Sequence, residues 1–256
     1  MTDVAVSYPA DGNALNFRLE DDSFWFRHRN RCIGEAVRQF PPGGDILDVG
    51  GGNGFVARAL IDAGFATVLL EPGPQGAANA RAHRGIPDVI NATLEDAGLA
   101  RASVAAAGLF DVLEHIDDDR GFLSKLHDAL VPRGHIYVTV PAHQALWSVA
   151  DDEAGHFRRY STTSLSACFH FAGFDVLYAT YFFEILIAPL FLVRTLPFRL
   201  GLAGPRSAGA YNTEHTGGGS IRGLLERMLA REVAAIGRQR TLLTGTSCLL
   251  VARKRP

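Results

Sequence analysis

Apolar residues along this chain alternate between short continuous runs and longer segments with helical spacing. The runs that predict buried strands lie at 45–49, 66–72, 87–91, 103–111 and 135–141. The segments that predict helices lie at 24–40, 52–64, 74–85 and 117–134. Strands that alternate with helices in this way are typical of a parallel sheet whose crossover helices cover both faces.

The C-terminal part of the chain departs from this alternation. It predicts a helix at 161–173, a strand at 174–183, an amphipathic helix at 221–237 and a last strand at 246–253. Between the strand 174–183 and the helix 221–237 lie an apolar segment, 184–200, and a glycine-rich segment, 201–220. We therefore expect a single α/β domain with a doubly wound, seven-stranded Rossmann-like sheet and a helical cap inserted before the last strand. Its parts would be an N-terminal arm and helix (1–40), a cofactor-binding core (41–183), the cap (184–238) and the last strand (239–256).

The composition of the chain argues against some classes of binding partner, nucleic acid first among them. The 256 residues are 47% hydrophobic and carry a formal net charge of −2, so no strong field favours nucleic acid. Three scattered cysteines in apolar surroundings indicate buried thiols in a reducing compartment. The first residues show no signal-peptide pattern, and we expect a cytoplasmic protein. The apolar run 185–193 is far shorter than the ~20 residues of a membrane span, although contact with a membrane interface stays open.

The stretch DILDVGGGNGF, residues 45–55, places four glycines directly after an apolar run. A dinucleotide turn would need a third glycine where Phe55 stands, and a phosphate loop would need a lysine that is absent here. Asp48 repels phosphate but suits a cation. Glu71, at the end of the second strand, is placed to accept hydrogen bonds from ribose hydroxyls. Together these residues indicate a positively charged nucleoside without phosphate, such as S-adenosylmethionine.

Four motifs occur in order: DILDVGGGNG, LLEP, LFDVLEHIDD and LVPRGHIYVTVP. They resemble the motifs of class I S-adenosylmethionine-dependent methyltransferases. The flanking FWFRHRNR, LWSVADDEAGHFRRYSTTSL and GTSCLLVARK resemble a bacterial subgroup that acts on small molecules. The resemblance implies S-adenosylmethionine as cofactor. It implies cofactor contacts from Asp48, Gly50, Gly52, Asn53, Gly54, Glu71, Pro72, Leu94, Glu95, Phe110 and Asp111.

Methylation of an oxygen needs a base, which typically contributes ~10²–10⁴-fold. The candidates for catalysis are His115, His156 and Tyr160, and His115 could instead hold the cofactor. Asp111, Glu114 and His115 form a D-x-x-E-H pattern that resembles the metal-binding E-x-x-E-H of ubiquinone-pathway O-methyltransferases. Because aspartate replaces the first glutamate and shortens its reach, a divalent metal is not expected, although whether these three residues bind one stays open.

The segment after the strand 135–141 overhangs the same end of the sheet and predicts acceptor contacts. Together with an N-terminal aromatic lid, the candidates are Phe24, Trp25, His143, Trp147 and Arg159. The competing interpretation is an internal network of salt bridges with Asp151, Asp152 and Glu153.

The expected function is O-methylation of a small, partly apolar molecule under a mobile cap at 184–220. The alternatives are N-methylation of a specialised metabolite and a non-catalytic nucleoside-binding scaffold. A dehydrogenase is disfavoured by the missing glycine. The acceptor and the oligomeric state are not indicated by the sequence.

Overall fold

The computed structural model describes residues 17, 19–202 and 222–256, and in these ranges the chain folds around one sheet. Seven strands pair in the order β3-β2-β1-β4-β5-β7-β6. Their bounds are β1 Ile46–Val49, β2 Thr67–Leu70, β3 Val89–Ile90, β4 Val104–Phe110, β5 Leu130–Pro141, β6 Phe174–Phe182 and β7 Ser247–Lys254. Strand β7 runs antiparallel to both β5 and β6, and the other pairs are parallel. The seven-stranded, doubly wound sheet expected from the sequence is confirmed.

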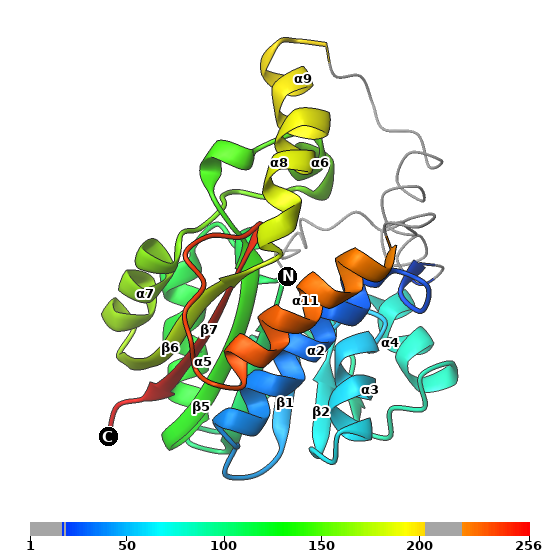
Figure 1. Ribbon diagram of the computed structural model, residues 1–256. Coiled ribbons are helices and arrows are strands. Elements are labelled where there is room, and N and C mark those ends of the chain that lie inside the picture. Colours follow the sequence, from blue (N-terminus) through cyan, green and yellow to red (C-terminus); the bar gives the residue numbers. More distant parts are fainter. Residues whose placement is uncertain (1–16, 18, 203–221) are drawn as a thin grey trace.

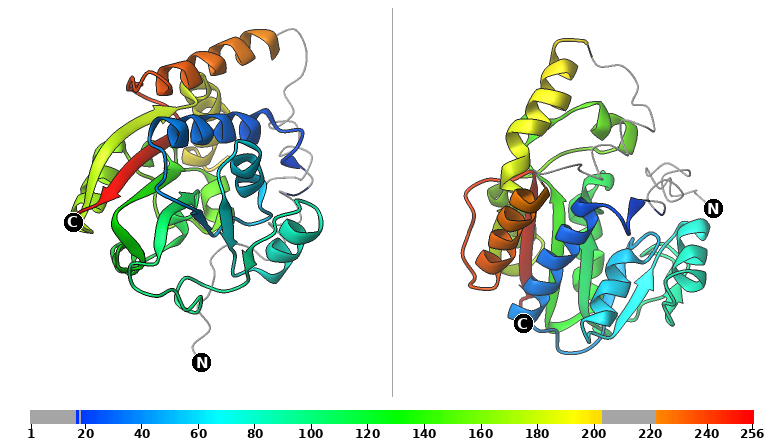
Figure 2. Two further views of the ribbon diagram at one scale, coloured as in Figure 1. Left: turned by 90° about the horizontal axis from the view of Figure 1, so that it is seen from below. Right: turned by 45° about the vertical axis from the view of Figure 1, so that its right-hand side comes forward.

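Helices cover both faces of the sheet, as Figure 1 and the two views of Figure 2 show. On one face lie α2 (Phe24–Gln39), α3 (Phe55–Asp62), α4 (Pro74–Ala82) and α11 (Arg222–Ile236). On the other lie α5 (Asp119–Ala129) and α7 (Thr162–Phe171). Helix α2 begins at Ser23, whose hydroxyl accepts hydrogen bonds from the backbone N–H groups of Trp25 and Phe26.

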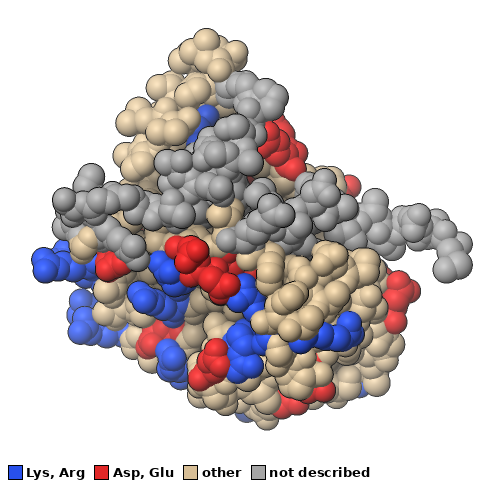
Figure 3. Space-filling model, turned by 90° about the vertical axis from the view of Figure 1, so that its right-hand side faces the viewer, with Lys and Arg blue, Asp and Glu red and all other residues tan. Residues whose placement is uncertain are grey.

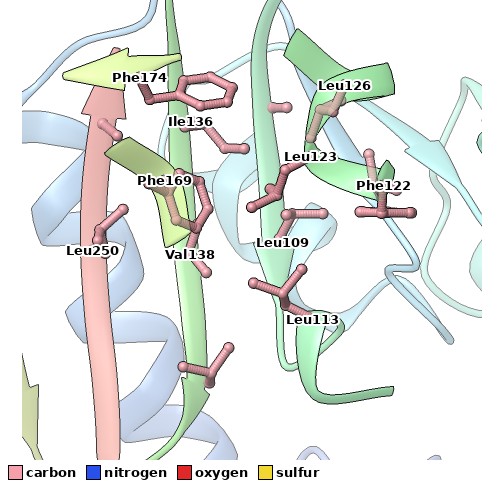
Figure 4. Close-up of a cluster of buried hydrophobic side chains, with 14 of the residues drawn as sticks. Leu109, Leu113, Phe122, Leu123, Leu126, Ile136, Val138, Phe169, Phe174 and Leu250 are labelled. Atoms are coloured by element: carbon pink, nitrogen blue, oxygen red, sulfur yellow. The ribbon is translucent and has the colours of Figure 1, made fainter. Parts of the chain in front are cut away.

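Two apolar clusters fix these helices to the sheet. The cluster drawn in Figure 4 joins Leu109, Val138 and Leu250 of the strands to Leu123 of α5 and Phe169 of α7. The second cluster, on the opposite face, joins strand residues to Ile33 and Val37 of α2 and to Leu229 and Ile236 of α11. Successive residues of a strand point to opposite faces, so one apolar run serves both clusters. The three cysteines are buried and free, as expected.

One helix ends earlier than the sequence predicts. The segment 117–134 was expected to stay helical as far as the stop signals Pro132 and Gly134, but α5 ends at Ala129. Strand β5 begins at Leu130, which pairs with Val104 before the register shifts. Pairing with a neighbouring strand thus outweighs the local helical preference of this segment.

The inserted segment after β6 stands beyond the carboxyl ends of the parallel strands (Figure 1). It consists of η3 (Glu184–Leu186), α8 (Ile187–Leu190), a π-helical turn η4 (Phe191–Thr195) and α9 (Leu196–Arg199), which we call the cap column. Figure 3 shows this projection as mostly uncharged, above a body on which acidic and basic side chains are interspersed. The glycine-rich part of the expected cap, 203–220, lies outside the described residues. Within the described residues no helix is long and apolar enough to cross a membrane.

Helix α11 does not belong with the cap column, although the sequence grouped both in 184–238. It packs beside α2 and contributes Leu229 and Ile236 to the second cluster. In the cap column, Ile185 and Leu186 pack against that cluster, whereas Leu192 and Val193 are 60% and 66% exposed. The column is therefore anchored at its base and exposes apolar side chains farther out.

Candidate active site

A cavity of about 1160 Å³ opens at the carboxyl ends of β1, β2 and β4. These strands meet at the point where the sheet order reverses, which is where open α/β sheets bind ligands. Helix α2, the glycine turn, the segment after β4, helix α6 (Val149–Ala154) and the cap column all contribute to its wall. Of the residues predicted from the sequence, the cavity is lined by Phe24, Trp25, Asp48, Gly50, Gly52, Asn53, Glu71, Pro72, Leu94, Glu95, Phe110, Asp111, His115, His156 and Arg159.

The glycine turn folds tightly between β1 and α3. Gly50, Gly52 and Gly54 have φ angles of 68°, 55° and 79°, a conformation that is costly for any residue with a Cβ. Gly51 has a different reason to be glycine, because an added Cβ would lie 2.3 Å from Leu69 Cδ1 and 2.5 Å from Asp48 Oδ2. Gly51 therefore packs closely against Asp48 and Leu69, and the backbone of the turn lines the cavity.

Two carboxylates, Glu71 and Asp48, lie at the end of the cavity that the glycine turn borders, and their surroundings suit a polar, positively charged ligand. Glu71 accepts hydrogen bonds from the backbone N–H groups of Gly52 (2.8 Å) and Gly73 (2.7 Å), which hold it at the end of β2. Asp48 is fully buried, and within the described residues neither of its carboxyl oxygens has a hydrogen-bond partner. Burial raises the pKa of Asp48 to about 7, against the lowering influence of Arg29. A buried acid without a partner is costly until a cation approaches it, so the site fits the expected cofactor.

Two other predicted cofactor residues have partners of their own. Asn53 donates to Glu20 Oε1 (3.1 Å) and accepts from Asn79 (2.9 Å). Glu95 accepts from Lys125 Nζ (2.7 Å). Both still line the cavity, so their assignment to the cofactor stays a prediction.

The segment after β4 carries a strained aspartate. Asp111 has φ 58°, and its carboxylate is bound by the Arg29 guanidinium of α2 and by Thr139 Oγ1 at 3.1 Å. Arg29 also lies over the Trp25 ring, with its Cζ 5.3 Å from the ring centroid. The aspartate thus fixes α2 to the strand ends. Sequence reasoning missed Arg29; its spacing of four residues from Trp25, which puts both on one helix face, was the available signal.

Beyond Asp111, a short helical turn η1 (Leu113–His115) places two titratable groups at the cavity. Glu114 is 1% exposed, and neither carboxyl oxygen has a hydrogen-bond partner among the described residues. Burial, reinforced by the charge of Asp111, raises the pKa of Glu114 well above its ordinary value. Burial and then the neighbouring His156 lower the pKa of His115 to about 4, so its imidazole is neutral near pH 7. Sequence reasoning considered Glu114 only as part of the D-x-x-E-H pattern.

The segment after α6 brings a second imidazole to the first. The rings of His115 and His156 are 4.7 Å apart in an edge-to-face arrangement. Asp151 binds His156 Nδ1 at 2.9 Å and Arg159 Nε at 2.6 Å. Burial alone would raise the pKa of Asp151, but the hydrogen bonds and charges of His156 and Arg159 outweigh it and lower the pKa to about 2. Arg159 is therefore paired internally, as the competing interpretation of the sequence held, while it also borders the cavity.

Four predicted residues lie outside the cavity lining. One is Gly54, the residue that precedes the first turn of α3, and the other three belong to the segment 143–160. The Tyr160 hydroxyl donates to Asp119 (2.9 Å), and the His143 ring stacks on Tyr181 with centroids 4.8 Å apart. Trp147 Nε1 donates to Asp152 (2.9 Å). The sequence placed these three residues near the site because they share a segment with His156, but their side chains turn to other partners.

The cap column supplies an apolar wall of the cavity, and its η4 turn contacts α6, the helix that precedes His156. Its residues in the lining are Leu186, Pro189, Leu190, Val193 and Arg194. The column is held there by hydrogen bonds from Thr195 Oγ1 to the Leu146 carbonyl (3.0 Å) and from Arg199 to the Ala145 carbonyl (2.8 Å).

Comparison with known proteins agrees with this geometry. A family model described as a methyltransferase domain matches residues 18–179. A curated relative from Mycolicibacterium smegmatis, named as a probable S-adenosylmethionine-dependent methyltransferase, is 27% identical over 170 residues, 66% of either chain. The mitochondrial ubiquinone biosynthesis O-methyltransferase of Schizosaccharomyces pombe is 26% identical over 131 residues, 48% of this chain and 43% of that protein. The matches thus span less than two thirds of these relatives.

The fold has solved counterparts as well. A methyltransferase of Haloferax volcanii, solved in complex with a methyltransferase activator, superposes with a TM-score of 0.64 at 19% identity. The alignment covers 97% of this chain and 99% of that one. At this identity the likeness shows the fold alone.

Glu71→Ala should weaken S-adenosylmethionine binding by about 1–3 kcal/mol, because a buried hydrogen-bonding carboxylate at the end of β2 is lost. Isothermal titration calorimetry measures the effect directly. The matched control is Asp88→Asn, an exposed acid near β3, which should bind as the unaltered protein does. Equal affinity in the Glu71 variant would remove this residue from the cofactor site.

Asp48 should make cofactor affinity depend on pH. Its raised pKa of about 7 means that the free protein holds a proton there at pH 6, and a cation binds the ionised form better. Binding then releases the proton, so affinity should rise by about an order of magnitude between pH 6 and pH 7.5. In Asp48→Asn the affinity should be lower at pH 7.5, and this rise should disappear. An unchanged pH profile in the variant would contradict the assignment.

Proposed function

This chain belongs to the methyltransferase domain family, and on that premise we propose that it transfers a methyl group from S-adenosylmethionine to an oxygen of a small, partly apolar molecule. One observation carries the proposal. A single cavity joins the glycine turn, with its prepared acids, to a pair of histidines and an apolar wall. The cofactor of the family is S-adenosylmethionine, whose sulfonium supplies an activated methyl group and its leaving group when bound.

The residues of this chain would bind and orient the two reactants. Glu71 would accept from the ribose hydroxyls, Asp48 would face positive charge, and the backbone of Gly50 and Gly52 would allow close approach. The aromatic side chains Phe24 and Trp25 of α2 line the cavity and would exclude water from it. Holding two reactants in line contributes up to about 7–11 kcal/mol in well-oriented systems.

Proton removal from an acceptor hydroxyl would fall to the histidine pair. His156 is the better placed of the two, because Asp151 behind it fixes the ring and stabilises the charge that the ring gains on taking a proton. The carboxylate at 2.9 Å from Nδ1 leaves Nε2 as the proton acceptor. His115 lies against this ring and, being neutral, adds no opposing charge.

The chemical class of the acceptor follows from the apolar wall that the cap column adds to the cavity. Leu186, Pro189 and Leu190 present apolar surface there, and Val193 both lines the cavity and is 66% exposed, so this surface continues to the outside. An acceptor with an apolar body would lie along the cap column, with its hydroxyl at the histidines. Leucine and valine burial is worth about 1.5–3 kcal/mol per side chain, so this contact would dominate acceptor affinity.

The function is tested by incubating the protein with S-adenosylmethionine and paired small molecules. Each pair shares an apolar body and differs in one group, hydroxyl or amine. Mass spectrometry should detect the gain of one methyl group on the hydroxyl member. Methylation of the amine member alone would support N-methylation instead. Cofactor binding with no transfer to any member of a broad panel would favour a nucleoside-binding scaffold.

His156→Ala should lower kcat by about 10²–10⁴-fold if it is the base, while S-adenosylmethionine affinity stays the same. Tyr160→Phe is the comparison, since the Tyr160 hydroxyl is bound to Asp119 away from the cavity and its loss should change kcat little. A larger loss of turnover in Tyr160→Phe than in His156→Ala would reverse the two assignments.

A further inference from the structure

Three potential metal ligands from two separate segments converge at the acceptor end of the cavity. One ligand atom each of Glu114, His115 and His156 lies within 4.8 Å of the others. The first two residues follow β4 on η1, and the third follows α6. All three line the cavity, so an ion among them would remain open to a ligand on one side.

The surroundings of the Glu114 carboxylate indicate a binding site for a cation. The residue is 1% exposed, and among the described residues no donor reaches either of its oxygens. Buried polar groups in folded proteins almost always have partners, and a buried carboxylate without one is costly. A cation bound by both oxygens or by one would remove that cost.

His156 has the support that is typical of a metal-ligating histidine. Asp151 binds its Nδ1 at 2.9 Å, and this carboxylate is in turn held by the Ser148 N–H at 2.9 Å and by Arg159. A carboxylate behind the ring fixes the tautomer, so that Nε2 offers its lone pair to a ligand.

The two segments that carry the ligands are pinned to each other. The Phe157 N–H donates to the Glu114 carbonyl at 2.8 Å, and Arg158 donates to the Ile116 carbonyl at 3.0 Å. Zinc ligands bind at about 2.0–2.2 Å, which puts neighbouring donor atoms about 3.5 Å apart in a tetrahedron. Rotation of the three side chains would therefore have to bring their ligand atoms closer by roughly an ångström, starting from the spacing of at most 4.8 Å.

We propose that Glu114, His115 and His156 form a binding site for a divalent cation, with Zn²⁺ as the best match to two imidazoles and one carboxylate. This set differs from the D-x-x-E-H pattern in the sequence, because Asp111 is bound to Arg29 and Thr139 and its place is taken by His156. The fourth position faces the cavity.

The inference deepens the proposed function by specifying how the acceptor oxygen is activated, and only that role rests on the proposed function. A bound cation lowers the pKa of a hydroxyl that coordinates it, so the hydroxyl loses its proton to water before the methyl group is transferred. The methyl carbon then forms its bond to the oxygen as its bond to the cofactor sulfur breaks. Without the ion, His156 would have to take the proton itself. The preferred acceptor would thus be one whose oxygen can bind the ion.

The test is metal binding by the full chain in the absence of cofactor and acceptor. Protein freed of metal by dialysis against a chelator is titrated with Co²⁺, whose visible absorption reports its ligands, and with Zn²⁺ in a calorimeter. We expect one ion per chain. Glu114→Gln and His156→Ala should each weaken binding at least tenfold, and Asp151→Asn should weaken it about 10–100-fold. The controls are Glu153→Gln and His170→Ala, which alter exposed side chains and should bind as the unaltered chain does.

The outcomes separate this inference from the proposed function. Absence of a bound ion, or equal binding by Glu114→Gln, His156→Ala and the controls, would overturn the site, even if methyl transfer were observed. An ion bound as expected without methyl transfer would leave the site standing and remove the proposed function. Circular dichroism of each variant checks that it is folded. Glu114→Gln is the most informative variant, because Glu114 gives up no side-chain hydrogen bond among the described residues.

Discussion

The parallel pairing of β1 with β4 is the constraint on which the site depends. Asp48 stands opposite Gly108 in this pair, so the two strands end side by side at the point where the sheet order reverses. The glycine turn continues from one strand end and the segment with Asp111, Glu114 and His115 from the other. No crossover helix separates them, because the helices after β1 and β4 lie on opposite faces. The glycine turn and the histidines therefore border one cavity, which would bring the cofactor and the acceptor together.

This arrangement gathers several buried carboxylates at one end of the sheet, which is unfavourable for the stability of the fold. Asp48, Glu71 and Glu114 are each at most 6% exposed. Among the basic residues that line the described part of the cavity, Arg29 and Arg159 are each bound to another aspartate and Lys125 is bound to Glu95. Raised pKa values at Asp48 and Glu114 express the same imbalance. A protein built only for stability would replace these side chains with apolar ones. Keeping them makes sense where cationic ligands complete the site, so the unfavourable charges are themselves evidence of what the cavity receives.

The sequence predicted the sheet, and it predicted which residues around the glycine turn line the cavity, because both are local. Strand, glycine turn and helix are adjacent in the chain, and Glu71 follows directly from the end of β2. It could not predict which side chains of the segment 143–160 reach the cavity. His156 and Tyr160 are four residues apart, yet one lies against His115 and the other binds Asp119. The difference arises from contacts with residues about 40 positions away, such as the bond from Arg158 to the Ile116 carbonyl. Arg29 was missed for the same reason, since its partner Asp111 lies 82 positions along the chain.

Around the histidines, the segments that carry Glu114 and His156 are held more firmly than the cap column. Glu114 and His156 are held by backbone hydrogen bonds between their segments and by the capped turn at Ser148, so the reacting groups keep their places when the cavity is empty. The cap column, in contrast, is anchored at its base by packing of Ile185 and Leu186 and at its side by hydrogen bonds from Thr195 and Arg199 to carbonyl groups. Substitutions in its apolar wall can change the shape offered to an acceptor without disturbing the histidines. If the proposed roles hold, the chemistry is fixed by the sheet and recognition is carried by the insertion. The two could then change independently, as in folds that host many functions.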